Sequence, residues 1–426
     1  MGVFSGPEIA TSGLIFSFDQ SNTDKSWKGK PTTNFYTNGH FSGGNGVTQE
    51  SGSNATNEVI VFKNPGNSDY VLRQTGTVAF TEYQINLTTQ LAASTTYVLS
   101  GWYAESPDYS CADGSRMFHS RAYSTSGANV ALGIGIGTVL ETRIVNGITW
   151  KYCYATITTP ADYNNVFEWY LGYGGSAYTG YRYYTNLQME VGTFPSRFVD
   201  GTRSNTQALL DLTNRNTITA NSLSYASNNS FSFNGTNNSI TVGQTLNYIP
   251  ALSNFTLETW LRVPAYPTAA ANNAYGQTDR AGVLFGAAYY SGAALYWNGN
   301  SAGTALNIFA FIRGQDAYRQ TSSKSISLNT WTHLVMVNNY TASLIQFYVD
   351  GVLFHETTGP SQQYDSSLVP TAGNIGLCKA QIDGGGTSNY SNLNCEVPIA
   401  RIYKDKALSA AEVRQNFNAL RGRFGI

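Results

Sequence analysis

Charged side chains are scarce in this chain of 426 residues. Asp, Glu, Lys and Arg together make up 12% of it, about half of the ~25% found in an ordinary soluble domain. The formal net charge is −1, so there is no positive excess to attract a nucleic acid. No apolar run approaches the roughly 20 residues that a membrane-spanning helix requires. We therefore expect neither a nucleic acid nor a membrane as a partner.

The N-terminus lacks a targeting pattern. It reads MGVFSGPEIATSGLIFSFD, without the basic start and the long apolar stretch of a secretory signal. Gly6 stands where a myristoylation motif has Ser or Thr. These absences indicate a protein made in a cytoplasm, although its low-charge composition is typical of exposed β-proteins.

Disulfide and metal-ligand patterns are also missing. The cysteines form no CxxC pair, and no His lies near them with the spacing of a zinc site. We expect Cys153 to be a small buried hydrophobe. Two outcomes stay open for Cys378 and Cys395, a disulfide that closes a loop or free thiols in a reducing environment, and we favour the free thiols. The four cysteines are Cys111, Cys153, Cys378 and Cys395.

Glycine and tyrosine are abundant instead, with 42 and 29 residues. A chain rich in Gly, Tyr, Ser and Thr suits twisted sheets with polar loops, whereas helices favour Ala, Glu, Lys and Leu. Short strand signals, such as those at 131–139 and 166–171, recur between clusters of Gly, Asn, Ser and Pro. We predict an all-β fold of two tandem β-sandwiches (jelly rolls) with one short C-terminal helix.

The strand pattern breaks in a polar stretch, DGTRS at 200–204, which we interpret as a domain boundary. A polar stretch also follows the short apolar run at 14–18. The predicted organisation is therefore an N-terminal segment of residues 1–25, a first sandwich of residues 26–204 and a second sandwich of residues 205–426.

The helix is predicted in LSAAEVRQNFNALRG at 408–422. Ser409 can cap its first turn while Glu412 reaches back, which makes a capping box. Val413 and Phe417 recur at helical spacing, so one face can dock on a sheet. Gly422 is the predicted end of the helix.

A hairpin is predicted in WTHLVMVNNYTASLIQFYVDGVLFHE at 331–356. The Asp-Gly pair at 350–351 favours a type I′ turn, because both residues tolerate positive φ. Val349 would then face Val352, and Phe347 would face Phe354, on one apolar face of a half-buried pair of strands.

The second half of the chain resembles the laminin-G/concanavalin-like lectin superfamily. Four stretches carry this resemblance in order and spacing: FSFNGTNNSITV (231–242), FTLETWLRV (255–263), WTHLVMV with its FYVDG partner (331–351) and IARIYKDKALSAAEVRQNF (399–417). The resemblance implies a two-sheet jelly roll over roughly residues 205–426, with Trp331 and the Asp-Gly hairpin in one sheet.

The first half resembles the galactose-binding-type jelly rolls used as carbohydrate-binding modules. The stretches concerned are TTYVLSGWYAE (95–105), WKYCYATITTP (150–160) and YYTNLQMEVGTFPSRFVDGTRS (183–204). The last of them looks like the closing strand of such modules in tailed-phage structural proteins. GPEIATSGLIFSFDQSN (6–22) looks like the start of phage lectin-domain proteins, which implies that residues 1–25 attach the chain to a virion.

Catalytic motifs are absent from the sequence. Hydrolases of the concanavalin-like fold typically carry paired acids as E-x-D-x-x-E, and no such spacing occurs here. No G-x-S-x-G nucleophile elbow is present either, and His333 is expected to lie on a sheet face. We therefore predict a protein that is not an enzyme.

Two clusters of aromatic residues are the candidate sugar-binding sites, because a sugar ring has apolar C–H faces and hydroxyl edges. The competing interpretation is that these rings line sheet faces or subunit contacts. Calcium is a candidate ligand of the DGGGTSN loop, where Asp383 would supply an oxygen, since many laminin-G-like domains bind it on a rim loop. The candidate sugar-binding residues are Tyr289, Tyr290, Tyr296 and Trp297 in the second half, and Tyr173, Tyr178 and Tyr181 in the first.

These observations predict a virion structural protein of a tailed phage, made in the host cytoplasm. We expect an exposed fibre, baseplate or capsid-decoration component that adheres to host-surface glycans and contacts other virion proteins. Low charge and abundant Tyr favour a homo-oligomer, with a trimer preferred. Two alternatives stay open, a cement or adaptor protein that joins virion subunits and a polysaccharide-degrading tail spike.

Overall fold

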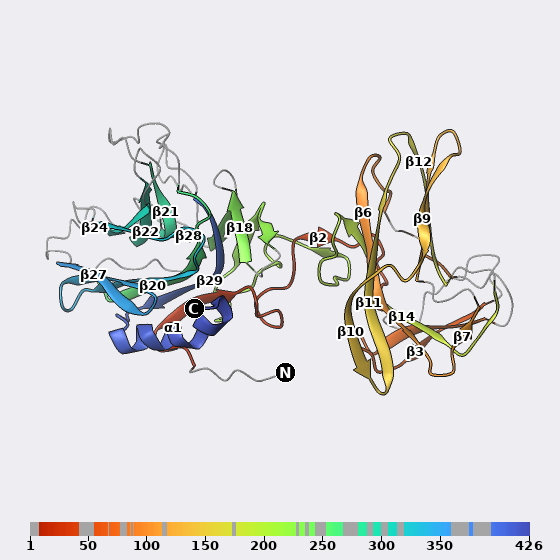
Figure 1. The fold of residues 1–426 in the computed structure, drawn as a ribbon, viewed down its shortest axis with the longest axis horizontal. Coiled ribbons are helices and arrows are strands. Elements are labelled where there is room, and N and C mark those ends of the chain that lie inside the picture. The colour runs from red at the N-terminus through yellow and green to blue at the C-terminus, as the bar shows by residue number, and fades with distance from the viewer. Residues whose placement is uncertain are drawn as a thin grey trace. The chain divides into compact units, whose positions relative to one another are not determined.

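The computed structural model describes residues 8–41, 55–66, 68–76, 83–85, 87, 89–112, 117–172, 176–226, 230–234, 238–242, 253–266, 280–287, 293–299, 306–312, 319–358, 375–377 and 393–426. They form two compact units (Figure 1). We call Lys30–Ser204 the first sandwich, and Met1–Gly29 together with Asn205–Ile426 the second sandwich. The predicted all-β fold with one short C-terminal helix, α1 (Ala410–Phe424), is confirmed.

The first sandwich packs a six-stranded sheet on a four-stranded sheet. Leu99 and Tyr103 of the first sheet meet Phe118 and Trp169 of the second in a buried core. The six-stranded sheet has the order β10 (Thr138–Val145), β11 (Ile148–Thr158), β6 (Thr96–Glu105), β14 (Arg182–Val191), β4 (Tyr70–Gly76) and β3 (Ala55–Val61). The four-stranded sheet has the order β5 (Tyr83–Ile85), β12 (Tyr163–Leu171), β8 (Phe118–Ser124) and β9 (Asn129–Gly135). Two short pairs join β2 (Thr32–Thr33) with β15 (Thr202–Arg203), and β7 (Ser110–Cys111) with β13 (Tyr178–Thr179).

The second sandwich packs an eight-stranded sheet on a seven-stranded sheet. Its core joins Leu257 and Phe347 of the first sheet to Phe285 and Leu295 of the second. The eight-stranded sheet has the order β17 (Ser224–Ala226), β18 (Ser230–Asn234), β29 (Asn394–Lys404), β20 (Phe255–Arg262), β25 (Thr332–Asn339), β26 (Leu344–Val349) and β27 (Val352–Thr358), and β1 (Leu14–Asp19) also pairs with β29. The seven-stranded sheet has the order β16 (Ile218–Asn221), β19 (Ser239–Val242), β28 (Ile375–Leu377), β21 (Arg280–Ala287), β22 (Ala293–Gly299), β23 (Leu306–Ile312) and β24 (Arg319–Ser325).

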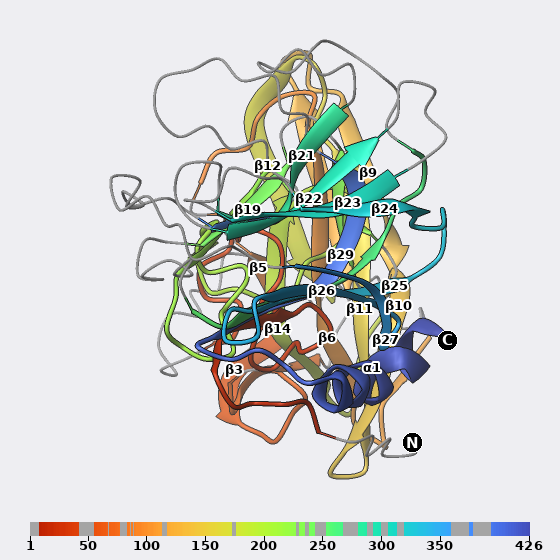
Figure 2. The same cartoon turned by 90° about the vertical axis from the view of Figure 1, so that its left-hand side faces the viewer.

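Helix α1 covers the other face of the eight-stranded sheet, so the second sandwich has three layers (Figure 2). Val335 and Tyr348 of that face pack against Leu408 and Val413. The predicted capping box is present: Ser409 accepts from the Glu412 N–H, and the Glu412 carboxylate accepts from the Ser409 N–H. No helix in the described part of the chain is long and apolar enough to cross a membrane.

The helix runs past its predicted end. Gly422 lies within α1, and Gly425 is the C-cap, with φ of 73°. Phe424, in the last turn, stacks on Trp260 with 4.2 Å between ring centroids. The helix thus ends two residues beyond the first glycine that could have ended it.

The predicted hairpin forms, with one change of register. Val349 faces Val352 across the turn, and Asp350 has φ of 52°, as a type I′ turn requires. Phe347 lies opposite His355 instead of Phe354, because β27 holds one extra residue there. This β-bulge ends the predicted apolar face early, and Val352 is 62% exposed.

The strand predicted at 131–139 is two strands in different sheets. The chain leaves β9 in the four-stranded sheet and enters β10 in the six-stranded sheet around Gly137. Gly137 has φ of 72°, and a Cβ there would lie 2.3 Å from the Tyr154 carbonyl oxygen. Only glycine can occupy the position where the chain passes from one sheet to the other. The pattern of apolar residues does not reveal this position.

The N-terminal segment belongs to the second sandwich. Strand β1 pairs antiparallel with β29, and Phe16 and Phe18 are fully buried in the second core. The structure thus groups residues 1–29, rather than a separate segment of residues 1–25, with the C-terminal half. Their expected role in virion attachment stays a prediction.

Candidate functional site

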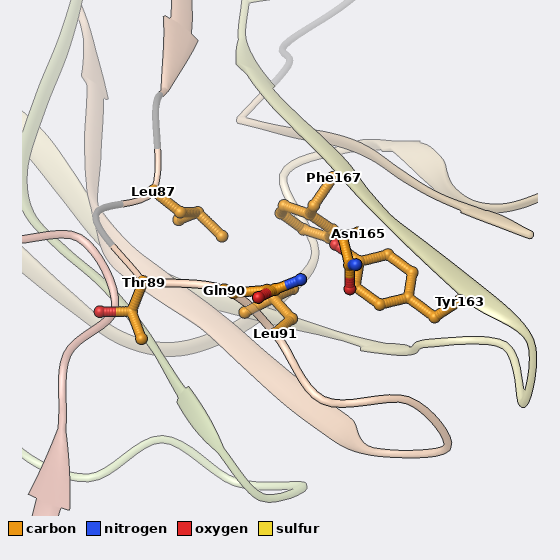
Figure 3. A pocket seen from close by; sticks show the side chains of 7 residues that line it. All are labelled: Leu87, Thr89, Gln90, Leu91, Tyr163, Asn165 and Phe167. Atoms are coloured by element: carbon orange, nitrogen blue, oxygen red, sulfur yellow. The ribbon is translucent and has the colours of Figure 1, made fainter.

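A pocket of about 390 Å³ lies on the first sandwich beside the N-terminal half of β12. This volume falls within the roughly 300–1,000 Å³ of small-molecule sites. One wall comes from β12 and the other from the segment that follows β5 (Figure 3). The lining residues are Leu87, Thr89, Gln90, Leu91, Tyr163, Asn165 and Phe167.

The β12 wall is shaped by an irregularity of the strand. Between Tyr163 and Phe167, β12 holds two more residues than its partner β8. The Asn164 side chain fixes the extra loop, since it accepts from the Val166 N–H at 3.0 Å and donates to a β8 carbonyl at 2.9 Å. Asn165 has φ of 70°, a conformation that Asn tolerates better than most residues. The strand therefore presents both aromatic rings and the Asn165 amide to one cavity.

The opposite wall is anchored to the sheet below it. Leu91 is buried, and the Ala92 N–H donates to the Tyr97 hydroxyl at 2.8 Å. The Thr159 hydroxyl donates to the Ala92 carbonyl at 2.6 Å. These contacts fix the segment from which Thr89 and Gln90 face the pocket.

The pocket lining is uncharged. Thr89, Gln90 and Asn165 offer hydroxyl and amide groups, and Tyr163 and Phe167 offer ring faces. Burial, and then the neighbouring Tyr97, raises the pKa of Tyr163 to about 12. The phenol is therefore protonated at neutral pH, and the cavity suits an uncharged ligand with both apolar and hydroxyl surfaces.

A second aromatic surface covers the outer face of the six-stranded sheet. Phe62 stacks on Tyr183 with 4.8 Å between centroids, and Arg73 lies 4.6 Å over the Tyr181 ring. Arg143 lies 5.4 Å over Trp102, which is 6% exposed. We call this surface the aromatic face, and its rings are Phe62, Trp102, Trp150, Tyr152, Tyr181 and Tyr183.

The predicted sugar-binding residues reach different places. Tyr181 joins the aromatic face, whereas Tyr178 is 5% exposed and lies under the Arg182 guanidinium at 4.1 Å. The structure describes only the backbone of Tyr296 and Trp297, on β22. Tyr173, Tyr289 and Tyr290 lie outside the described residues.

The predicted metal and disulfide positions are only partly described. Asp383 and Cys378 lie outside the described residues. Within the described ranges, no group of three or more His, Cys, Asp or Glu could hold a metal ion. Cys153 is buried, as predicted, and Cys111 and Cys153 are free cysteines.

A fully buried carboxylate, Glu258 on β20, lies under helix α1. Its oxygens accept from Arg401 at 2.5 Å, from Asn416 at 2.7 Å and from the Tyr403 hydroxyl at 3.2 Å. His333 Nε2 lies 3.1 Å from the same carboxylate. The expected position of His333 on a sheet face is correct, but that face is sealed by the helix.

Electrostatics keep Glu258 ionised. Burial by itself would raise the pKa of this carboxyl, but the Arg401 guanidinium, His333 and Asn416 more than offset burial. They lower the pKa from 4.5 to about 2. Because the group is fully buried and satisfied by four partners, it holds α1 on the sheet and offers nothing to a ligand.

Sequence reasoning did not find the pocket. The strand signal at 166–171 predicted the C-terminal part of β12, but Tyr163 and Asn165 lie before it. The available signal was the Asn164-Asn165 pair ahead of an apolar run, since Asn residues favour bulges and turns. The facing segment at 87–91 carries no pattern that predicts its packing.

One family matches the C-terminal part of the chain. Residues 233–414 match the family model described as the Concanavalin A-like lectin/glucanases superfamily. These residues are therefore similar to that superfamily. The matched stretch lies within the second sandwich, where the sequence predicted a lectin-type fold. No curated protein matches the chain.

Several solved structures match this chain at low similarity. The binding domain of botulinum neurotoxin serotype D is 18% identical, with a TM-score of 0.36 and 50% of each chain covered. A Trypanosoma rangeli sialidase is 16% identical, with a TM-score of 0.37, covering 52% of this chain and 32% of the sialidase. A heptameric SAP-like pentraxin from Limulus polyphemus is 16% identical, with a TM-score of 0.30, covering 40% of this chain and 71% of the pentraxin. This chain thus spans half the length of the neurotoxin domain and about a third of the sialidase.

Proposed function

We propose that this chain is a non-enzymatic, glycan-binding component of a phage virion, exposed on a tail or head fibre, a baseplate or a capsid decoration. The observation that carries the binding role is the pocket on the first sandwich. It combines the Tyr163 and Phe167 rings with the uncharged polar groups of Thr89, Gln90 and Asn165.

This combination suits a neutral saccharide. The C–H face of a sugar ring packs on an aromatic ring, while amides and hydroxyls pair with the sugar hydroxyls and fix its orientation. A carboxylated sugar would leave its charge without a partner, since no lining residue is a cation. We therefore propose an uncharged host-surface glycan as the ligand.

The similarity of residues 233–414 to the concanavalin-like superfamily supports a binding role for the second sandwich as well. The virion assignment rests on the stretches at 6–22 and 183–204, which are similar to parts of tailed-phage proteins. Several copies on one particle would convert weak single-site affinity into avidity.

A non-enzymatic role is supported by the position of Glu258. In a glycosidase two carboxyl groups must flank the scissile bond in an open groove. Glu258, the buried carboxylate with a neighbouring His333, is instead closed off beneath α1 and fully hydrogen-bonded. Its chemistry is that of a structural anchor.

A glycan array and host-cell binding assay on the purified full-length protein tests the proposal. Phe167→Ala removes a stacking face and is expected to weaken binding about tenfold or more, a loss of roughly 1.4 kcal/mol. Tyr181→Ala is the matched control, because it removes a half-buried ring of the aromatic face and leaves the pocket intact. A calcium chelator in a parallel arm tests the predicted Asp383 site.

The outcomes separate the candidate roles. Saturable binding that a defined neutral sugar competes, and that Phe167→Ala reduces, supports the proposal. Loss of binding with Tyr181→Ala alone would move the site to the aromatic face. No binding by folded protein would favour the cement or adaptor role, and release of shortened glycans would favour a degrading spike.

A further inference from the structure

Strand β10 is an exposed edge of the first sandwich. It ends the six-stranded sheet, and no described strand pairs with its free side. Every residue from Thr138 to Ile144 is exposed, and Ile144 reaches 75%. Val139 and Leu140 are 41% and 39% exposed. An edge strand with free backbone groups and exposed apolar side chains is a template for another strand.

The hairpin turn at 146–147 determines which backbone groups are free. Val145 faces its partner in β11 directly across this two-residue turn, so the two exchange both N–H···O bonds. Arg143, two residues back, also points its backbone groups toward β11. Thr142 and Ile144 therefore point their N–H and C=O groups toward the free edge.

The sequence of β10, TVLETRIV, is complementary to itself about Thr142. Suppose that two copies pair antiparallel with Thr142 opposite Thr142. Charges of opposite sign and apolar side chains of similar size then meet across the pair. The opposed residues are Val139 with Val145, Leu140 with Ile144, Glu141 with Arg143, and Thr142 with Thr142.

Two neighbouring registers also place the free N–H and C=O groups of the two strands opposite one another, but their side-chain pairs are less favourable. A two-fold axis through Glu141 would bring two carboxylates face to face, and one through Arg143 would bring two guanidinium groups together. Like charges directly opposite destabilise a strand pair, whereas opposite charges contribute roughly 0.2–1 kcal/mol. Within one copy Glu141 and Arg143 already form a 2.5 Å ion pair, so the centred register would build a four-charge cluster of alternating sign.

We propose that β10 pairs antiparallel with β10 of a second copy of this chain, centred on Thr142, and joins two six-stranded sheets into one. The irregularity between Val139 and Glu141 shortens the ladder, so the central residues carry the backbone bonds and Ile144 adds side-chain contact with Leu140 of the second copy. The symmetry is two-fold, which replaces the trimer expected from composition with an even number of copies.

Charge reversal on the full-length chain tests this pairing by sedimentation over a wide concentration range. The wild-type chain is expected to dimerise, and added salt should weaken the dimer. Glu141→Arg and Arg143→Glu each place like charges opposite one another, so each is expected to weaken self-association about tenfold, equivalent to roughly 1.4 kcal/mol. An equimolar mixture of the two variants restores opposite charges in both cross-strand pairs and should restore the dimer.

The controls make the result decisive. Val61→Lys changes a residue that is 71% exposed on the opposite edge strand β3, and it should leave association unchanged. A wild-type chain that stays monomeric at its highest soluble concentration would overturn the proposal. So would a mixture of the two reversed variants that associates no better than either alone.

Cross-linking gives a second test that does not depend on the charges. Opposed residues of a hydrogen-bonded pair have Cα atoms about 5.5 Å apart, which suits a disulfide. Thr142→Cys should therefore give a covalent dimer on oxidation, and the wild-type chain, with its own cysteines, is the control. A Thr142→Cys chain that sediments as a dimer but never cross-links would exclude this register.

Discussion

At the scale of single residues, Glu258 shows how a buried charge can serve as an anchor. An isolated carboxylate in a core would be costly, yet this one has an ion pair with Arg401 and hydrogen bonds from Asn416 and the Tyr403 hydroxyl. Asn416 also accepts from the Ala10 N–H at 2.7 Å. One carboxylate thereby connects the sheet, the C-terminal helix and the N-terminal segment.

Acid should weaken this anchor. The pKa of Glu258 is about 2 in the folded chain, against an ordinary value of 4.5. The stabilisation from its ionised form is therefore complete above pH 4.5 and is lost as the pH falls through 2. This pKa difference corresponds to about 3 kcal/mol of folding free energy. We predict that Glu258→Gln is less stable at neutral pH but loses less stability between these pH values.

Urea denaturation at a series of pH values, followed on the unfolding transition of the second sandwich, measures this effect. Glu356→Gln, at an exposed carboxylate of β27, should keep the wild-type pH dependence. A Glu258→Gln chain whose stability falls with pH as steeply as that of the wild type would contradict the prediction.

Ligand binding in the pocket should be insensitive to pH. No lining residue titrates near neutrality, and the pKa of Tyr163 is raised to about 12. We predict the same affinity for a neutral glycan from about pH 5 to 9, where model carboxyl groups and phenols keep one charge state. A change of affinity of tenfold or more across this range, measured by calorimetry, would point to a charged group in the site.

At the scale of elements, the hairpin tip at Gly351 supports the helix. Gly351 has φ of 75°, and a Cβ there would lie 3.0 Å from the Phe417 side chain of α1. Gly147, in the corresponding turn of the first sandwich, also has φ of 75° but has nothing within 4 Å. The two glycines share a backbone conformation and differ only in their surroundings.

We therefore predict a larger loss of stability for Gly351→Ala than for Gly147→Ala. Both substitutions strain the turn by roughly 1 kcal/mol, and the first also pushes on Phe417. Thermal unfolding, read for the sandwich that contains each change, measures the two losses. Equal losses would show that the hairpin tip does not support α1.

The N-cap of α1 should contribute measurably to the second sandwich. Ser409→Ala removes the acceptor for the Glu412 N–H and half of the capping box, at a cost of about 1 kcal/mol. Asn418→Ala, on the exposed side of the same helix, serves as the control and should be neutral or slightly stabilising. Chemical denaturation distinguishes them, and equal stabilities would contradict the role of the cap.

Elements with a local cause were predictable from the sequence. The capping box and the turn at Asp350 depend on residues close together in the chain, so the sequence predicted the correct residues for both. The division between β9 and β10 at Gly137 depends on the carbonyl of Tyr154, a residue of another strand. The pocket likewise needs β12 and the segment after β5 to meet, and their contact is not encoded in either stretch alone.

At the scale of the whole molecule, the second sandwich is discontinuous. The Lys28 backbone N–H donates to the Ala208 carbonyl at 2.9 Å. The chain therefore leaves the second sandwich and returns to it at adjacent points. A chain of residues 205–426 would lack Phe16 and Phe18, which are fully buried. We predict that it is less stable by several kcal/mol, since loss of one buried Phe side chain typically costs about 3–5 kcal/mol.

Joining residues 1–29 directly to residue 205 should restore most of this stability. Thermal unfolding of the two shortened chains beside the full-length protein measures the difference. Equal stabilities of the two shortened chains would mean that β1 contributes little to the second sandwich.

The discontinuity has a consequence for biosynthesis. The ribosome releases β1 early, but its partner β29 begins 375 residues later, from Asp19 to Asn394. At about 5–20 residues per second, roughly 20–75 s pass before the pair can form. The first sandwich has time to fold in that interval, while Phe16 and Phe18 of β1 remain exposed to solvent. The nascent chain should therefore depend on chaperones more than either sandwich would alone.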